Sequence, residues 1–145
     1  MASTNNVVIK TGIKLITFSD DSLTEILGTP VFSKFRINPT SIKLAERALE
    51  TASYFENFHY PDSGKAEDVF AINRELADKI SYILGYDSNE EVFGVFAPLD
   101  QDTKTGKFFI EIIVDKIMEI VEPEVKKRQE AMQKRADNYT KKYEG

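Results

Sequence analysis

The sequence contains no cysteine, no tryptophan and a single histidine, and these absences exclude several kinds of chemistry. Without cysteine the chain has no disulfide, no thiolate metal ligand and no cysteine nucleophile. A single histidine cannot form a metal centre that needs several histidines. No apolar run approaches the ~20 residues that a membrane-spanning helix needs, and the segment MASTNNVVIK lacks the features of a signal peptide. We therefore expect a soluble cytoplasmic protein without a metal ion, a cofactor or a membrane partner.

The charge of the chain is small overall but unevenly distributed. Its 145 residues, a length typical of one domain with a substantial core, carry a formal net charge of −5. Residues 123–145 contain seven basic and four acidic side chains, a net of +3, which leaves −8 on residues 1–122. We predict a globular domain over residues 1–122 and a basic helical extension over residues 123–145.

The N-terminal part of the domain predicts a small β element over about residues 7–37. Residues 7–18 are rich in β-branched side chains and favour a short hairpin or two edge strands. A polar cluster then caps a brief helix at residues 23–27. The segment at residues 31–37 alternates as a further strand, with Phe35 on its apolar face.

Three patterns predict helices in the middle of the chain. Apolar residues at steps of three and four indicate a helix from Asn38, as its N-cap, to about Phe58. A second clear stripe, over residues 66–84, is followed by a glycine that suits a left-handed cap. Ser88 and Glu91 have the spacing of a capping box and predict a short third helix.

A long helical pattern then runs from about Lys107 nearly to Tyr143. Pro123 is expected to kink or break it, because proline removes one helical hydrogen bond and clashes with the preceding turn. The predicted fold is therefore a mainly α-helical, compact domain. It has a small N-terminal β-hairpin or meander and a long, proline-interrupted C-terminal helix.

The first half of this long helix has an unusually wide apolar arc. Adjacent apolar residues cannot both face one core from a single helix, so two explanations stay open. Either other elements wrap the helix on several sides, or part of the arc binds a partner. The residues predicted for partner binding belong to this arc and to a thin stripe beyond Pro123: Phe108, Phe109, Ile112, Ile113, Val114, Met118, Met132 and Tyr139.

One loop matches two functional patterns in part. The segment Asp100-Gln101-Asp102-Thr103 has the spacing of a phosphatase nucleophile motif, but that motif follows a buried strand, and here Pro98 stands before it. The same residues align with the start of an EF-hand loop. Lys104, however, stands near the metal ligands, and Gly106 comes one position late. We interpret the segment as a solvated loop before a helix.

The usual catalytic residues are otherwise scarce. His59 lies in a predicted loop between two aromatic residues, where a surface or packing role is expected. The seven glycines form no phosphate-binding loop. We predict that the protein is not an enzyme and has no catalytic residue. The acidic domain also disfavours nucleic acid as a partner, although the basic extension keeps a small nucleic-acid-binding regulator as an alternative.

Several short motifs resemble a known group of phage proteins. They are the step Leu84-Gly85, the segment Asn89–Gly94 and the sequence Gly106-Lys107-Phe108-Phe109. They are similar to motifs of the small tail-assembly-chaperone-like proteins of siphophages and prophages of Gram-positive bacteria. The segment Phe35–Thr40, before the first long helix, also resembles the N-terminal half of that group.

This resemblance implies a non-enzymatic protein that binds the tape-measure protein and keeps it soluble during tail assembly. Such a chaperone acts in the cytoplasm of the host cell and is absent from the mature virion. Self-association is also expected, and the tail-tube protein is a further candidate partner. A head–tail connector or tail component that forms a ring stays open as an alternative.

Overall fold

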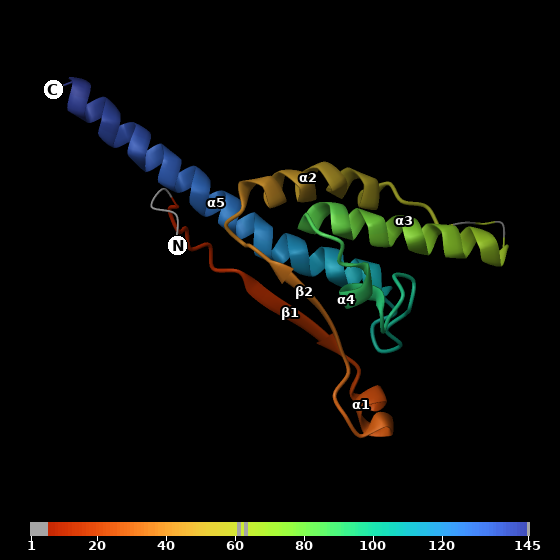
Figure 1. Ribbon diagram of the computed structural model, residues 1–145. Helices are drawn as coiled ribbons and strands as arrows, with labels where there is room; N and C mark the ends of the chain where they lie inside the picture. Colours follow the sequence, from red (N-terminus) through yellow and green to blue (C-terminus); the bar gives the residue numbers. More distant parts are fainter. Residues whose placement is uncertain (1–5, 61, 63, 145) are drawn as a thin grey trace.

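The computed structural model describes residues 6–60, 62 and 64–144, with side chains as far as Lys142. Pro61 and Ser63 of the predicted loop and the side chain of Tyr143 lie outside the described residues. Figure 1 labels the elements of the described part: β1 (Lys14–Ser19), α1 (Asp21–Leu27), β2 (Phe32–Ile37), α2 (Ile42–Glu56), α3 (Ala66–Leu84), α4 (Asn89–Phe93) and α5 (Phe109–Glu144). The fold is mainly α-helical with an N-terminal hairpin and a long C-terminal helix, which confirms the predicted fold class.

The first half of α5 lies at the centre of the fold. In Figure 1 it runs between the α2–α3 pair and the β1–β2 hairpin. Its residues Phe109, Ile113, Ile117 and Val121, spaced by four, are all buried in the hydrophobic core. Because neighbouring elements cover this half of α5 on more than one side, much of its wide apolar arc belongs to the core.

The ring of Phe109 connects three segments that are distant in sequence. Its centroid lies 5.4 Å from that of Phe18 in β1 and 5.9 Å from that of Phe93 in α4. A third ring, Phe96 in the loop after α4, lies 5.3 Å away. All three contacts are close to edge-to-face, an arrangement that aromatic pairs prefer. The hairpin and the α4 loop are thereby anchored to the beginning of α5.

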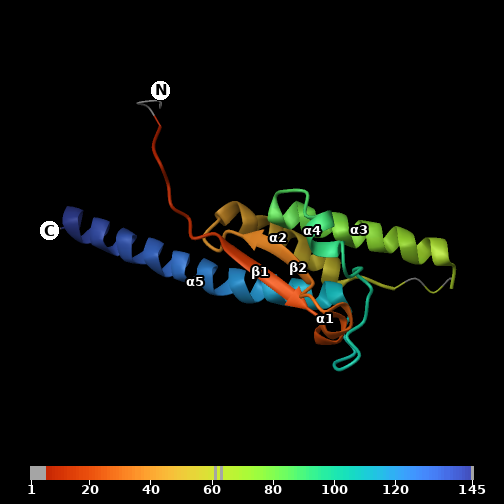
Figure 2. The same ribbon diagram turned by 60° about the horizontal axis from the view of Figure 1, so that its bottom comes forward.

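The hairpin forms between different segments than the sequence predicts. Residues 6–13 have no strand and form an exposed arm that leads away from the body (Figure 2), with Val7 81 % exposed. β1 instead pairs antiparallel with β2, and α1 connects the two strands. A strand needs a partner edge and a buried face, and only residues 14–19 find both, because Phe18 packs against the core. The predicted strand before Gly12 is therefore wrong.

Local hydrogen bonds decide where the first two helices begin. Asp20 caps α1 by accepting from Ser22 N–H at 2.9 Å, as the polar cluster predicts. The predicted N-cap of α2, Asn38, is wrong. Its side chain accepts from Thr40 N–H at 3.1 Å and forms a turn of its own, so the helix begins only after Ser41, whose hydroxyl accepts from Leu44 N–H.

The predicted capping box at α4 is also wrong, although the helix itself is present. Ser88 makes no side-chain cap and lies fully buried, with its hydroxyl 3.1 Å from that of Ser81 in α3. Glu91 forms an ion pair with Arg36 of β2 at 3.7 Å instead of reaching back to the cap. The two polar side chains therefore attach α4 to its neighbours. The predicted left-handed cap of α3 at Gly85 is present, with φ 82°.

Pro123 lies inside α5 and does not break it. The missing N–H costs one hydrogen bond to the carbonyl of Glu119, but the helix has many others on both sides. Val121 is buried and Val125 packs against the core, so tertiary contacts hold the helix on either side of the proline. α5 therefore crosses the predicted boundary at residue 123 as one helix, and its second half extends beyond the body (Figure 1).

A matched pair of substitutions tests the location of the core. Leu76 in α3 is 0 % exposed, whereas Leu49 in α2 is 51 % exposed. We expect Leu76→Ala to lower the free energy of unfolding by about 2–5 kcal/mol, because it leaves a cavity. Leu49→Ala should change it by roughly 0.5 kcal/mol. Urea unfolding of both variants measures this difference, and equal losses would contradict the assignment.

Candidate functional site

A groove of about 430 Å³ lies between α2 and α5, on the side of α5 that the hairpin leaves uncovered. The end of α2 and the segment after it form one wall, and α5 forms the other. Its floor consists of half-buried apolar side chains: Ala52, Phe55, Phe58, Val114 and Met118. Below them lie two buried side chains, Leu76 of α3 and Ile110 of α5. The groove is thus an apolar depression that is partly open to solvent.

Carboxylates surround this apolar floor. Glu56 lies on the α2 side, and Glu111, Asp115 and Glu122 lie on the α5 side. Of these four carboxylates, only Asp115 forms an ion pair with another described residue, Lys107, whose Nζ lies 3.2 Å away, and both side chains of that pair are exposed. A groove with an apolar floor and an acidic rim suits an amphipathic helix with an apolar stripe and basic flanks.

Tyr60 closes one end of the groove. Its hydroxyl donates to Glu111 Oε1 at 2.9 Å, and its ring centroid lies 4.9 Å from those of both Phe58 and Phe108. Burial, followed by the hydrogen bond and the negative charge of Glu111, raises the pKa of Tyr60 from 10.0 to about 12. The segment after α2 is thereby attached to the beginning of α5, which defines the shape of the groove at this end.

The predicted partner-binding residues separate into groups in the structure. Val114 and Met118 line the floor of the groove, and Phe108 contacts Tyr60 at its rim. Phe109 and Ile113 instead lie in the core, because they occupy the side of α5 that faces the hairpin and α4. Buried side chains contact no partner while the domain keeps this fold, so we assign these two residues a structural role.

The remaining predicted residues lie elsewhere on α5. Ile112 is half-buried and does not line the groove. Met132 and Tyr139 lie on the second half of the helix and are 65 % and 66 % exposed. The structure therefore does not bring these three side chains together with Val114 and Met118 within one copy of the chain.

Sequence reasoning did not identify the α2 side of the groove. Phe55 and Phe58 belong to an apolar helical stripe, which by itself indicates only a core face. Glu56 lies between them in sequence, and a glutamate at this position is as typical of an exposed helix face as of a binding site. The adjacency of this segment to α5 depends on tertiary packing, which no pattern within α2 predicts.

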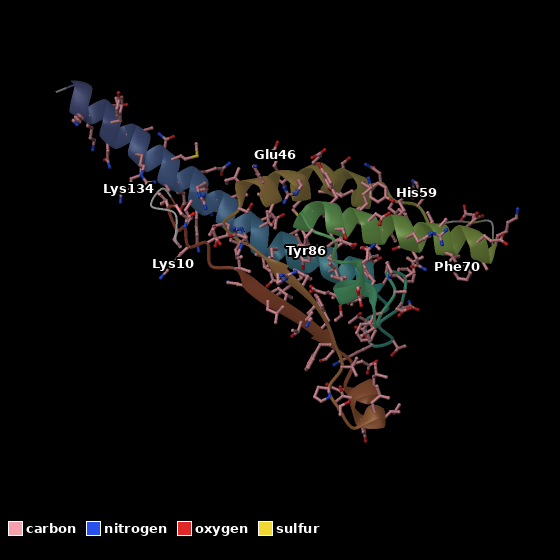
Figure 3. All side chains as sticks on the ribbon, in the orientation of Figure 1. Lys10, Glu46, His59, Phe70, Tyr86 and Lys134 are labelled. Atoms are coloured by element: carbon pink, nitrogen blue, oxygen red, sulfur yellow. The ribbon has the colours of Figure 1, made fainter. Side chains whose placement is uncertain are left out.

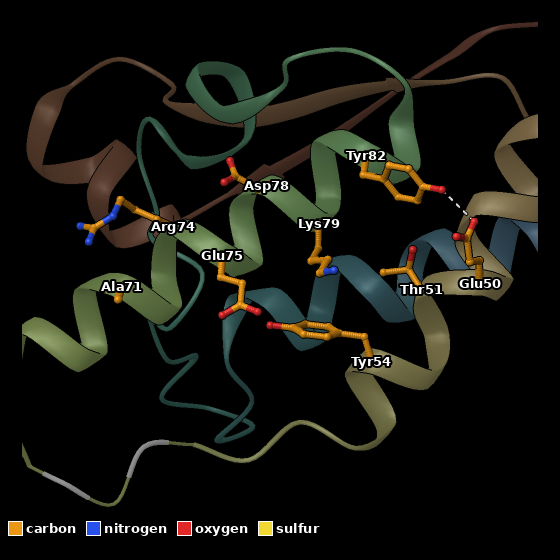
Figure 4. Close-up of a pocket in the computed structure, with 9 residues that line it drawn as sticks. All are labelled: Glu50, Thr51, Tyr54, Ala71, Arg74, Glu75, Asp78, Lys79 and Tyr82. Carbon is orange, nitrogen blue, oxygen red and sulfur yellow. Dashed lines mark hydrogen bonds between the residues drawn. The ribbon is translucent and has the colours of Figure 1, made fainter.

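A second cavity, of about 710 Å³, lies between α2 and α3 and is polar (Figure 4). Tyr82 donates a hydrogen bond to Glu50 at 2.7 Å across it, and Lys79 Nζ lies 4.6 Å from the ring centroid of Tyr54. Burial and a hydrogen bond to Glu75 raise the pKa of Tyr54 to about 12. These contacts join α2 to α3, and we assign the cavity no ligand.

The loop at residues 100–103 has the structure of a turn stabilised by its own side chains. Asp102 accepts from Lys104 N–H at 3.0 Å and from the Thr105 hydroxyl at 2.9 Å, and these hydrogen bonds lower its pKa. Among the described residues, no group of three or more histidine, cysteine or acidic residues is placed to hold a metal ion. The carboxylates of this loop therefore serve its turn geometry. His59 is exposed in the segment after α2 (Figure 3).

Comparisons of the chain with models of protein families, with curated proteins and with solved structures find no match. In the described part of the chain, no helix is long and apolar enough to cross a membrane. The groove between α2 and α5 is therefore the feature of the described chain that bears most directly on its function.

The environment of Tyr60 predicts its titration. Because its pKa is about 12 in the folded protein and 10.0 in the unfolded chain, its stabilising contribution is present below pH 10 and is lost between pH 10 and 12. Tyr60→Phe should remove one step of tyrosinate absorbance, with a midpoint near pH 12, from the alkaline titration of the protein. The absence of tryptophan makes that step measurable at alkaline pH.

Glu111→Gln is the control for this titration. It removes the negative charge but keeps an oxygen that can accept the hydrogen bond, so it should move the Tyr60 step toward lower pH. The difference in tyrosinate absorbance between the unsubstituted protein and Tyr60→Phe can be followed as a function of pH. A midpoint of that difference titration near pH 10 would contradict the assigned environment.

Proposed function

We propose that this protein is a non-enzymatic, helix-binding chaperone of phage tail assembly whose client is the tape-measure protein. The observation that carries the proposal is the groove between α2 and α5, with its apolar floor and acidic rim. The proposal also uses the resemblance of the motifs around residues 84–109 to tail-assembly-chaperone-like proteins. A tape-measure protein is a long, largely helical chain, and such a chain offers many amphipathic segments.

The dimensions of the groove support a helix as its occupant. Along α5 it extends from Ile110 to Glu122, which corresponds to about 18 Å of helix. That length matches roughly three turns of a client helix, enough for apolar anchors at positions i, i+3 or i+4, and i+7. The half-buried side chains Val114 and Met118 would contact those anchors from the α5 side.

A small groove of this kind supports weak, replaceable binding. One helix across about three turns buries less area than a typical stable interface. A chaperone that tail-tube subunits later displace needs contacts that dissociate readily. Many copies along one client chain would then supply the required occupancy through multivalency. The same weakness is consistent with a protein that acts in the host cytoplasm and leaves before the virion is complete.

The acidic rim supports selection of basic client segments. Four carboxylates, from Glu56 to Glu122, lie beside the apolar floor. They favour Lys or Arg at the flanks of a bound helix and disfavour acidic flanks, so binding should weaken as the salt concentration rises. We propose that this charge preference determines which parts of the tape-measure protein are covered.

Binding of client fragments tests the proposed function. Met118→Lys places a cation on the apolar floor and should weaken binding of tape-measure fragments by at least about tenfold. Leu49→Lys adds the same charge on an exposed part of α2 outside the groove and should leave binding unchanged. Fluorescence anisotropy with overlapping peptides of a tape-measure protein from the same genome measures both effects.

Several results would contradict this function. If no tape-measure fragment binds while designed basic amphipathic helices do, the groove binds helices but the client is wrong. If neither class of peptide binds, the helix-binding function itself is wrong. A fixed ring of one stoichiometry without any client would favour the head–tail connector instead.

A further inference from the structure

We infer that the groove of one copy receives the C-terminal part of α5 from a second copy, in competition with the client helix. We call residues 126–142 of α5 the tail segment. The inference depends on the proposed function in one respect, since both place a helix in the same groove. It adds that the protein carries its own competitor for that site.

The tail segment cannot reach the groove of its own chain. The groove is built along the first half of α5, and the tail segment continues the same helix without a break at Pro123. Figures 1 and 2 both show it extending away from the body. A straight helix cannot fold back onto itself, so a tail segment that enters this groove has to come from another copy.

The tail segment carries an apolar stripe that fits the apolar floor of the groove. Met132 and Tyr139 follow Val125 at intervals of seven residues, and Met118 of the groove floor precedes Val125 by seven. A seven-residue apolar repeat is the pattern with which two helices pack together. Val125 packs against the core of its own copy, whereas Met132 and Tyr139 lie largely in solvent. The same helical face thus begins in the groove and ends as an exposed stripe.

The charges of the tail segment are complementary to the rim. It contains seven basic and two acidic side chains, against four carboxylates around the groove. Arg128, Arg135 and Lys142 also recur every seven residues, each three positions after an apolar residue of the stripe, so they flank it on one side. Arg128 already donates to the carbonyl of Thr40 at 3.2 Å in its own copy. We therefore assign the main intermolecular contribution to Arg135.

The consequence is a competition between two equilibria. At high protein concentration and without client, tail segments occupy grooves and the average mass rises. A client helix with a better apolar stripe displaces the tail segment, so client binding disperses the self-associated protein. Exposed ion pairs such as Lys107–Asp115 cost little to exchange, which keeps this displacement easy.

Cross-linking between two different copies tests the contact directly. Because the chain has no cysteine, Met118→Cys marks only the groove of one full-length copy, and Met132→Cys marks only the tail segment of another, differently tagged copy. A short bismaleimide should join the two in a mixed dimer. The yield should exceed that of random collisions by roughly tenfold or more, because docking raises the effective concentration of the two thiols.

Ile26→Cys supplies the matched background for this experiment. Its position in α1 is 79 % exposed and lies at the tip of the hairpin, outside the groove. Mixed with Met132→Cys, it should give only the yield of random collisions. Equal yields for Met118→Cys and Ile26→Cys with Met132→Cys, or a strictly constant monomer mass in light scattering, would overturn the inference.

A pair of charge reversals separates a specific contact from general electrostatics. Arg135 flanks the stripe, whereas Lys134, which projects from α5 in Figure 3, lies on another face of the helix. Both Arg135→Glu and Lys134→Glu change the net charge by the same amount. Arg135→Glu should weaken self-association about tenfold, and Lys134→Glu much less. Equal weakening by the two variants would overturn the role of the stripe.

The same variants distinguish this inference from the proposed function. Arg135→Glu leaves the groove intact, so client fragments should bind it at least as well as they bind the unsubstituted protein. Self-association that depends on Arg135 without any client binding would support the inference and refute the function. Client binding by a protein that stays monomeric would do the reverse. DNA binding lost in Arg135→Glu, with no change in mass, would overturn the inference and favour the nucleic-acid alternative.

Discussion

Burial of the first half of α5 is the constraint on which the remaining structure depends. One helix has to supply the packing surface for α2, for the hairpin and for the α4 loop, and it does so with residues spaced by three and four. Phe109 is the clearest example of this shared packing surface, because rings from three different segments contact it edge to face. A small domain with few elements can bury enough apolar surface only if its central helix is apolar around much of its circumference.

The groove follows from the same constraint. α2 runs antiparallel to α5 and covers only one side of it, with Tyr60 after its end against Glu111 and Thr40 before its start against Arg128. The apolar arc of α5 is therefore wider than the elements available to cover it, and Val114 and Met118 remain at the surface. Tyr60 limits the groove at one end by joining the segment after α2 to Glu111. The candidate site is thus the part of a core face that the fold leaves uncovered.

Features that depend on neighbouring residues could be predicted from the sequence. Residues only a few positions away in the sequence determine the caps at Asp20 and Gly85 and the apolar stripe of α3. The predicted cap at Ser88 failed because a side chain of another helix forms a different contact with it. Ser88 is a good N-cap by pattern, yet its hydroxyl lies against that of Ser81 in α3. The pairing of β1 with β2 across α1 likewise depends on which strand can cover the core.

The candidate site could be predicted only in part. The apolar arc of α5 indicated a surface of interest, because it was too wide for one core face. The division of that arc between the core at Ile113 and the groove at Met118 could not be predicted, since it depends on the direction from which α2 approaches. The carboxylate of Glu56 became part of the site only through that approach.

The projecting half of α5 also governs how the molecule moves through solution. Residues 126–144 form a rod of about 28 Å, whereas a compact domain of the remaining residues has a radius of gyration of about 14 Å. The rod therefore adds a length similar to the diameter of the domain while contributing little mass. Its friction slows diffusion, so a single copy elutes from a gel-filtration column at the volume of a larger globular protein. Elution volume alone would thus suggest an oligomer even for isolated chains, and only methods that determine mass independently of shape can count the copies.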